Sequence, residues 1–221
     1  HEGRPGPVLL DIPIDVQQEL IPINMGGERQ EKTFSSGQNI NFRIDELLKL
    51  IQSSQKPIFL LGGGVRTSQA TKLVRAIISE WKIPAVHSLM GVDVLNSSSP
   101  YRIGMIGSYG NRWANRAIAK ADLIVALGTR LDIRQTGSDV ADFIRGKKIF
   151  RVDVDEFEIN GRIRADISVE ADLQSFTAAL SEVKFELDRL DWLASIQKEA
   201  ELFPQWAEQP SDVGFNPDEI M

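Results

Sequence analysis

Short apolar runs alternate with amphipathic stretches from residue 57 onward, and this alternation limits the fold more than any other feature of the sequence. Apolar runs of strand length lie at 57–62, 83–87, 122–128, 148–155 and 165–169. Between the first two, apolar residues recur at helical spacing from Ala70 to Trp81. Strands that alternate with helices pair in parallel. The sequence therefore predicts an α/β fold, a doubly wound parallel sheet with helices on both faces.

Further helices are predicted from the same periodicity. They lie at 41–53, 111–119 and 138–144, in the stretch that carries Leu173, Phe176, Leu180 and Val183, and at 187–206. Before them, residues 7–12 read as a short buried strand that stops at Pro13. A stretch rich in Pro, Gly, Ser, Asn and Gln reads as a linker over 18–39, and the glycine-rich stretch 88–110 has no predicted element.

The composition excludes several classes of function. The net charge of −6 argues against nucleic acid as a partner. The absence of cysteine and the presence of only two histidines exclude thiolate chemistry and a histidine-based metal cluster. No apolar run approaches the ~18 residues of a membrane-spanning helix. We therefore expect no membrane partner, no metal in this chain and a cytoplasmic location.

The carboxyl ends of the predicted strands carry residues suited to a phosphorylated ligand. Ligands of open α/β sheets bind beyond these ends. The segments found there are Gly62-Gly63-Gly64, Ser88-Leu89-Met90-Gly91, Gly128-Thr129-Arg130 and Asp153-Val154-Asp155. Glycine admits a phosphate close to the backbone, arginine pairs with a diphosphate, and carboxylates suit ribose hydroxyls or an adenine amine.

Each of these features also has a purely structural interpretation. Glycines at strand ends often only make tight turns. Arg130 and Arg134 can pair with surface carboxylates such as Asp132 or Asp139. The aspartates after the fourth strand can cap the following turn. Likewise His87 can be a structural histidine. Four further residues can equally belong to the apolar core or line a cofactor site, namely Met90, Met105, Ile106 and Tyr109.

Common nucleotide motifs are absent. In the dinucleotide pattern G-x-G-x-x-G, Gly62, Gly64 and Thr67 occupy the three glycine positions, and His87-Ser88 stands where an acidic residue is needed. No P-loop and no G-x-S-x-G elbow occur. A nicotinamide-dependent dehydrogenase is therefore not predicted.

Several longer motifs resemble a known family. The opening GRPGPVLLDIPIDVQ resembles the end of the first domain of thiamine-diphosphate-dependent enzymes of the acetolactate synthase type. The rest resembles their central domain, through GGGV, SLMG, GMIGSYGN, ALGTRLDIRQTG, RVDVDEFEI and RADISVEAD. The resemblance implies a six-stranded parallel sheet that often holds FAD in an extended pose without a net redox role.

The resemblance also implies which residues contact the cofactor. Those expected along the cofactor are Arg4, Gly62, Gly63, Gly64, Ser88, Leu89, Met90, Ile106, Gly107, Ser108, Tyr109, Gly128, Arg130 and Arg134. Those expected at the ribose and adenine end are Asp153, Val154, Glu158, Asp166 and Ile167. No catalytic residue and no metal ligand is expected in this chain.

Three positions depart from the family pattern. Ser108-Tyr109 stands where acetolactate synthases tend to have Met-His, Ile133 where they tend to have a second Asp, and residues 111–113 read Asn-Arg-Trp. These departures favour a relative that acts on another acceptor, such as a sugar, as much as an acetolactate synthase.

The domain organisation follows from the same resemblance. Residues 1–17 are expected to be the C-terminal end of a pyrimidine-binding domain, followed by a linker over 18–39 and the central FAD- or nucleotide-binding domain over 40–185. Residues 186–221 are expected to form a helix and a linker that lead to a diphosphate-binding domain. Both ends of the sequence read as internal to a longer protein. That parent is expected to be a homo-oligomer that binds thiamine diphosphate and Mg²⁺ and acts on pyruvate or another 2-oxo acid.

Two alternatives to a FAD-binding domain stay open. One is the central domain of a related decarboxylase that binds ADP or a CoA substrate, and the other is a spacer domain with an empty site. The chain alone is expected to be inactive, because it contains no G-D-G motif and not the family's activating glutamate.

Overall fold

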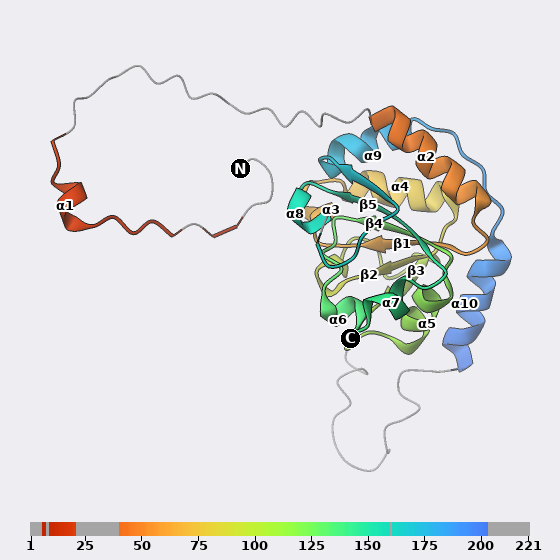
Figure 1. Cartoon of the computed structure of the whole chain (residues 1–221). Helices are drawn as coiled ribbons and strands as arrows, with labels where there is room; N and C mark the ends of the chain where they lie inside the picture. The colour runs from red at the N-terminus through yellow and green to blue at the C-terminus, as the bar shows by residue number, and fades with distance from the viewer. Residues whose placement is uncertain (1–5, 8, 21–39, 160, 203–221) are drawn as a thin grey trace, which may run out of the picture. The chain divides into compact units, whose positions relative to one another are not determined.

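Six parallel strands form one sheet in the order β3-β2-β1-β4-β5-β6 (Figure 1). The strands are β1 (Pro57–Leu61), β2 (Ala85–His87), β3 (Arg102–Met105), β4 (Leu123–Leu127), β5 (Lys148–Asp153) and β6 (Ile167–Glu170). This computed structural model describes residues 6, 7, 9–20, 40–159 and 161–202. The predicted doubly wound parallel sheet is confirmed, and its strand order reverses between β1 and β4, which is the topological switch point.

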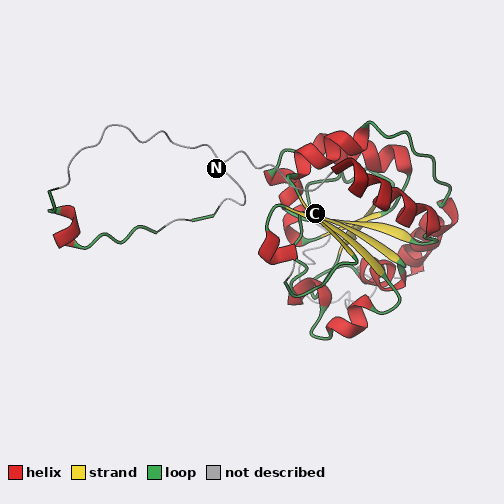
Figure 2. Cartoon of the chain, turned by 45° about the horizontal axis from the view of Figure 1, so that its top comes forward, coloured by secondary structure: helices red, strands yellow, loops and turns green. Residues whose placement is uncertain are grey.

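Helices cover both faces of this sheet, so that the fold has three layers (Figures 1 and 2). The longer helices are α2 (Ile40–Ser53), α4 (Thr71–Trp81), α5 (Arg112–Lys120), α9 (Leu173–Ser181) and α10 (Leu190–Leu202). The shorter ones are α1 (Ile14–Gln17), α3 (Gly64–Thr67), α6 (Ile133–Thr136), α7 (Val140–Ile144), α8 (Glu156–Ile159) and the 3₁₀ turn η1 (Leu89–Gly91).

Alternation along the strands separates two apolar cores. In β1, Phe59 and Leu61 belong to the core under α2, α4 and α9, whereas Ile58 and Leu60 belong to the core under α5 and α10. All five residues of β1 are buried, and the same holds for β4. Fully buried parallel strands of this kind explain why the sequence shows continuous apolar runs rather than alternating ones.

The strand β3 was not predicted, since it lies in the glycine-rich stretch 88–110. It is an edge strand with only Ile103 in the apolar core, and it contains Gly104 at a φ of +144°. A Cβ at Gly104 would meet the Asn111 side chain at 2.3 Å. The strand therefore depends on pairing with β2 and on a glycine, and neither leaves a strand-like pattern in the sequence.

The segment 9–13 contains no strand, so the predicted strand over 7–12 is wrong in the described residues. Leu9 and Leu10 are 92% and 79% exposed, and the short helix α1 follows. An isolated extended segment leaves its backbone N–H and C=O groups without a ladder, and no strand among the described residues pairs with it. The expected linker 18–39 lies outside the described residues from residue 21 onward.

Helix α10 belongs to the same core as the sheet. Trp192, Leu193 and Ile196 are buried, and the Trp192 indole N–H donates to the Pro57 carbonyl at 3.1 Å. Glu199 pairs with Lys120 of α5 at 2.8 Å. The core of this domain therefore extends past residue 185, where the sequence suggested a boundary.

Candidate functional site

The loops after β1, β2, β3, β4 and β5 meet at the carboxyl edge of the sheet and form the candidate site. We call this set the carboxyl-edge loops, defined as residues 62–65, 88–92, 106–111, 128–135 and 153–158. They flank the switch point between β1 and β4, where open α/β sheets bind their ligands. The sequence analysis placed most of its candidate residues in these loops.

The three consecutive glycines let two backbone segments cross at this switch point. A Cβ at Gly62 would lie 2.0 Å from the Gly128 carbonyl oxygen, and a Cβ at Gly64 would lie 2.7 Å from the Gly128 Cα. The Gly62 N–H donates to the Leu127 carbonyl at 2.9 Å, and the Gly64 N–H donates to the Gly128 carbonyl at 3.0 Å. Gly62 and Gly64 are therefore required by packing, whatever binds above them.

The middle glycine lies against the next loop. A Cβ at Gly63 would come within 2.9 Å of the Met90 Cβ, and one at Gly91 within 2.3 Å of the Leu61 carbonyl oxygen. Close backbone contact of this kind holds the loops after β1 and β2 together. The large side chains of Leu89 and Met90 are then left 66% and 59% exposed at the edge of the sheet.

The loop after β3 is fixed by hydrogen bonds to its own helix and to α6. Asn115 of α5 accepts from the Gly107 N–H at 2.8 Å and donates to the Gly107 carbonyl at 3.0 Å. The Ser108 N–H donates to the Arg134 carbonyl at 2.9 Å. Ile106 is buried in the core, whereas Tyr109 is 81% exposed. Of the two interpretations left open for these residues, Ile106 therefore fits the core and Tyr109 fits a surface residue beside the candidate site.

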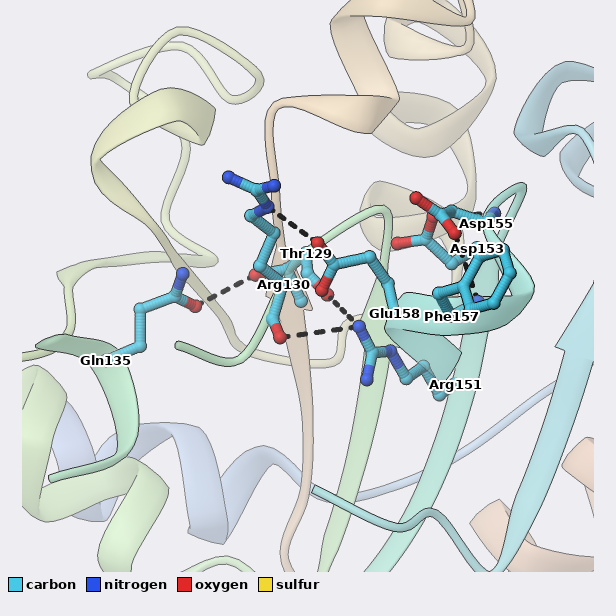
Figure 3. Close-up of polar contacts among 8 residues, drawn as sticks. All are labelled: Thr129, Arg130, Gln135, Arg151, Asp153, Asp155, Phe157 and Glu158. Atoms are coloured by element: carbon cyan, nitrogen blue, oxygen red, sulfur yellow. Dashed lines mark hydrogen bonds and ion pairs between the residues drawn. The ribbon is translucent and has the colours of Figure 1, made fainter. Parts of the chain in front are cut away.

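Arg130 pairs with Glu158 across the ends of β4 and β5. Its Nε donates to Glu158 Oε1 at 2.8 Å, and this contact raises the pKa of Arg130 (Figure 3). The aspartate at 132 instead caps α6, because it accepts from the Arg134 and Gln135 N–H groups. The structural interpretation that paired Arg130 with Asp132 or Asp139 is therefore replaced by a pair with Glu158.

The carboxylates after β5 organise their own turn. Asp153 is buried and accepts from the Asp155 N–H at 3.2 Å, and Asp155 accepts from the Phe157 N–H at 3.0 Å (Figure 3). These bonds are the turn caps that formed the structural interpretation of both aspartates. Val154 is half-buried beside them, and Phe157 is 82% exposed.

Asp166 and Ile167 lie at the opposite edge of the sheet, which corrects their placement beside the other candidates. Asp166 precedes β6, accepts from the Ile149 N–H at 2.9 Å and pairs with Lys148 at 2.7 Å. Ile167 pairs with Phe150 in the first half of β5. The chain reaches the carboxyl edge only after Glu170, and Asp172 is found there as the cap of α9.

His87 is a buried and neutral side chain at the end of β2. Burial lowers the pKa of His87, and the positive charge of Arg102 lowers it further, against an opposing hydrogen bond with the Ser88 carbonyl at 3.0 Å. Its Nδ1 is therefore the protonated nitrogen that donates to Ser88. This geometry matches the structural interpretation of His87. Arg4, by contrast, lies outside the described residues.

Sequence reasoning missed two side chains that support these loops. Asn115 clamps Gly107 but gives no signal, because it reads as an ordinary polar residue of a helix. Arg151 is fully buried in β5, and its signal is a charge inside the apolar run KIFRVDVD. A buried charge in a strand is rare enough to mark a position with a specific role.

Comparison with known proteins agrees with this architecture. Residues 44–180 match the family described as thiamine pyrophosphate enzyme, central domain. The match covers the sheet and most of its helices. The chain belongs to this family. It contributes the central domain, the one that contains the switch point and the carboxyl-edge loops.

Similar proteins are acetolactate synthase large subunits. That of Lactococcus lactis is 31% identical over 99% of this chain and 38% of its own length. Isozyme 2 of Escherichia coli is 32% identical over 86% of this chain and 33% of its own length. A probable acetolactate synthase large subunit of Methanocaldococcus jannaschii is 35% identical over 88% and 34%. The chain thus spans about a third of the length of the curated relatives it matches.

Proposed function

We propose that this central domain binds FAD at its carboxyl-edge loops and serves a thiamine-diphosphate-dependent carboligase that acts on pyruvate or another 2-oxo acid. The names of the similar large subunits support the class of reaction. Because this chain spans about a third of those relatives, the reaction itself belongs to the whole parent protein.

The observation that carries the proposal is the mixture of groups at this one edge. Two exposed arginines, Arg130 and Arg134, stand on consecutive parts of the loop after β4. Leu89, Met90 and Tyr109 expose large apolar surfaces on the neighbouring loops. A ligand with a diphosphate and a flat aromatic ring would satisfy both kinds of surface.

An extended FAD fits this arrangement better than a phosphate alone. The arginines suit its diphosphate, and the exposed apolar side chains suit its isoalloxazine. The ribose and adenine end is assigned to Asp153, Val154 and Glu158, whose carboxylates accept from hydroxyl and amine groups. The flavin supplies no net electron transfer to carboligation, so the residues of this chain only bind and orient it.

Thiamine diphosphate and Mg²⁺ are assigned to other parts of the parent enzyme. Within the described ranges, no group of three His, Cys, Asp or Glu residues is placed to hold a metal ion. No described helix is long and apolar enough to cross a membrane. A homo-oligomeric parent, a cytoplasmic location and inactivity of this chain alone stay predictions.

The test is a titration of the chain with FAD, followed by flavin fluorescence, for the unchanged chain and for Arg134→Ala. One charge-assisted contact is worth ~1.5–3 kcal/mol, so Arg134→Ala should weaken binding roughly ten- to a hundredfold. Arg145→Ala is the matched control, since this exposed arginine precedes β5 at the opposite edge and pairs with Asp142 at 3.1 Å.

The titration also separates the alternatives. Equal loss of affinity in both arginine variants would show a nonspecific charge effect and would refute the proposed site. Tight binding of ADP or CoA with weaker binding of FAD would favour the decarboxylase alternative. Failure of all three ligands to bind the unchanged chain would favour a spacer domain.

A further inference from the structure

The buried guanidinium of Arg151 lies on the face of β5 that packs under the carboxyl-edge loops. Its neighbours Phe150 and Val152 belong to the core on the opposite face, so Arg151 shares the face of Ile149. The residue has no exposed surface. Arginine keeps its charge at any ordinary pH, so burial is costly unless the group makes specific contacts.

Two hydrogen bonds from Arg151 go to the turn that follows β4. Arg151 Nη2 donates to the Thr129 carbonyl at 2.8 Å and to the Arg130 carbonyl at 3.4 Å (Figure 3). Two left-handed residues, Gly128 at a φ of +56° and Leu131 at +53°, bracket this turn. The left-handed conformation is strained for leucine, so the turn needs support from outside itself.

The supported turn determines where both site arginines stand. Arg130 lies within it, and Thr129 Oγ1 donates to Gln135 Oε1 at 2.8 Å. Gln135 belongs to α6, which also carries Arg134, and the Arg134 carbonyl accepts from Ser108. One chain of hydrogen bonds therefore runs from Arg151 through the turn to α6 and the loop after β3.

We propose that Arg151 is a positioning residue of the nucleotide site, which fixes the turn after β4 so that the guanidinium groups of Arg130 and Arg134 face the diphosphate of the ligand. This inference rests on the proposed function, because it assumes that a nucleotide binds at these loops. The competing explanation is that Arg151 contributes only to the stability of the fold.

The two explanations differ in their effect on ligand selectivity. A positioning role acts on the diphosphate contacts alone, so Arg151→Met should weaken ADP binding by about tenfold or more while adenosine binding changes less than about twofold. A purely structural role would weaken both ligands alike. Arg151→Lys keeps a cationic donor below the turn and should recover most of the ADP affinity.

The experiment measures ADP and adenosine affinity of the 221-residue chain by calorimetry for these variants, with Ile149→Val as control. Ile149 is buried on the same face of β5, and its truncation perturbs the same core but removes no hydrogen-bond donor to the turn. Loss of ADP affinity alone in Arg151→Met, recovered in Arg151→Lys and absent in Ile149→Val, supports the proposal. Equal loss of both ligands, or no loss, overturns it.

A second readout does not depend on any ligand. Hydrogen exchange of the amides of Gln135 and Ser108 reports whether α6 and the loop after β3 stay fixed. Arg151→Met should speed exchange at both, and Arg151→Lys should restore protection. If Arg151→Met does not fold, Arg151→Gln replaces it, because its shorter neutral side chain no longer reaches the Thr129 and Arg130 carbonyls as the guanidinium does. An unchanged ADP-to-adenosine ratio in Arg151→Gln with altered stability means a structural role. If no nucleotide binds the unchanged chain, the proposed function fails, and unaltered exchange at Gln135 and Ser108 would refute the positioning role separately.

Discussion

Adding one methyl group at Gly62 should destabilise the fold by ~1–3.5 kcal/mol, although alanine is otherwise an easy replacement. The new Cβ would lie 2.0 Å from the Gly128 carbonyl oxygen and 2.6 Å from the Thr129 Cα, and Cβ contacts below 3.0 Å are essentially absent from real structures. Both contacts are with backbone, so no side chain can rotate away. The segments after β1 and β4 must therefore separate.

The magnitude follows from what this separation disturbs. Overpacking a close contact costs ~1–3 kcal/mol. The Gly62 N–H also weakens its hydrogen bond to the Leu127 carbonyl, at 2.9 Å, which is worth about 1 kcal/mol. Alanine also lowers the conformational entropy of the unfolded chain, which stabilises the folded state by ~0.4–1 kcal/mol and offsets part of this loss. The expected net loss of unfolding free energy is therefore ~1–3.5 kcal/mol, to be measured as a lower urea midpoint with an unchanged m-value.

Gly146→Ala is the matched control for this measurement. That glycine has a φ of +71° and no atom within 4 Å of an added Cβ. It carries a conformational cost of ~1–2 kcal/mol but no steric one. If Gly62→Ala unfolded within ~0.5 kcal/mol of the unchanged chain, packing at the switch point would not require this glycine. The argument for the crossing backbone segments would then be wrong.

The described contacts also predict the effects of two substitutions and of acid pH. Asp122 accepts hydrogen bonds from Ser54 and from the two N–H groups that precede β1. Asp122→Asn should therefore lower the free energy of unfolding, measured in urea, by ~1–3 kcal/mol. The control Asp45→Asn changes an exposed residue and should leave the free energy of unfolding unchanged. Burial raises the pKa of Asp122 and of Asp166, but hydrogen bonds to each carboxylate outweigh it and lower both pKa values below the usual range. The folded state then binds these protons only at lower pH than the unfolded state, so the stabilisation is present above about pH 4 and is lost as the pH falls through the folded pKa values. Urea midpoints from neutral to acid pH should show a shallower decline for Asp122→Asn than for the unchanged chain, and parallel curves would contradict the assignment. Trp192→Ala should lower the free energy of unfolding by ~3–5 kcal/mol, because the side chain is buried against the sheet. The control is Leu190→Ala in the same helix, whose side chain is half-exposed. An equally small loss of stability in both variants would mean that α10 is not part of this core.

The central sheet was predictable because its strands are buried on both faces. In β4 all five residues are buried, and helical stretches flank this short apolar run. A run of this length is typical of a buried strand and too short for a helix. The edge strand β3 gave no such signal, since its stability comes from pairing with β2 and from Gly104. Local pattern fails where long-range pairing decides the structure.

The candidate site was predictable where residues directly follow a strand. Gly62 and Gly128 come immediately after β1 and β4, so their common edge follows from parallel pairing alone. Asp166 was misplaced because a residue that precedes a strand lies at the other edge, and β6 begins one residue later than Asp166. The reason for the glycines also differed, since packing between backbones accounts for Gly62 and Gly64.

Contacts between the loops could not be predicted from the sequence. The pair of Arg130 with Glu158 joins residues 28 positions apart, and the support that Arg151 gives to the turn after β4 spans 22. Either arginine had several carboxylates or carbonyls within reach along the chain. Only the three-dimensional arrangement of β4 and β5 selects the partners.

The location of the ligand is the central claim, and amide chemical shifts measured by NMR during a FAD titration test it most directly. The account predicts saturable shifts at amides of the carboxyl-edge loops, such as those of Gly63, Ser108 and Arg130. Amides at the opposite edge, such as those of Gln55 and Lys148, should not move. Shifts confined to the opposite edge, or no shifts at saturating FAD, would contradict the account.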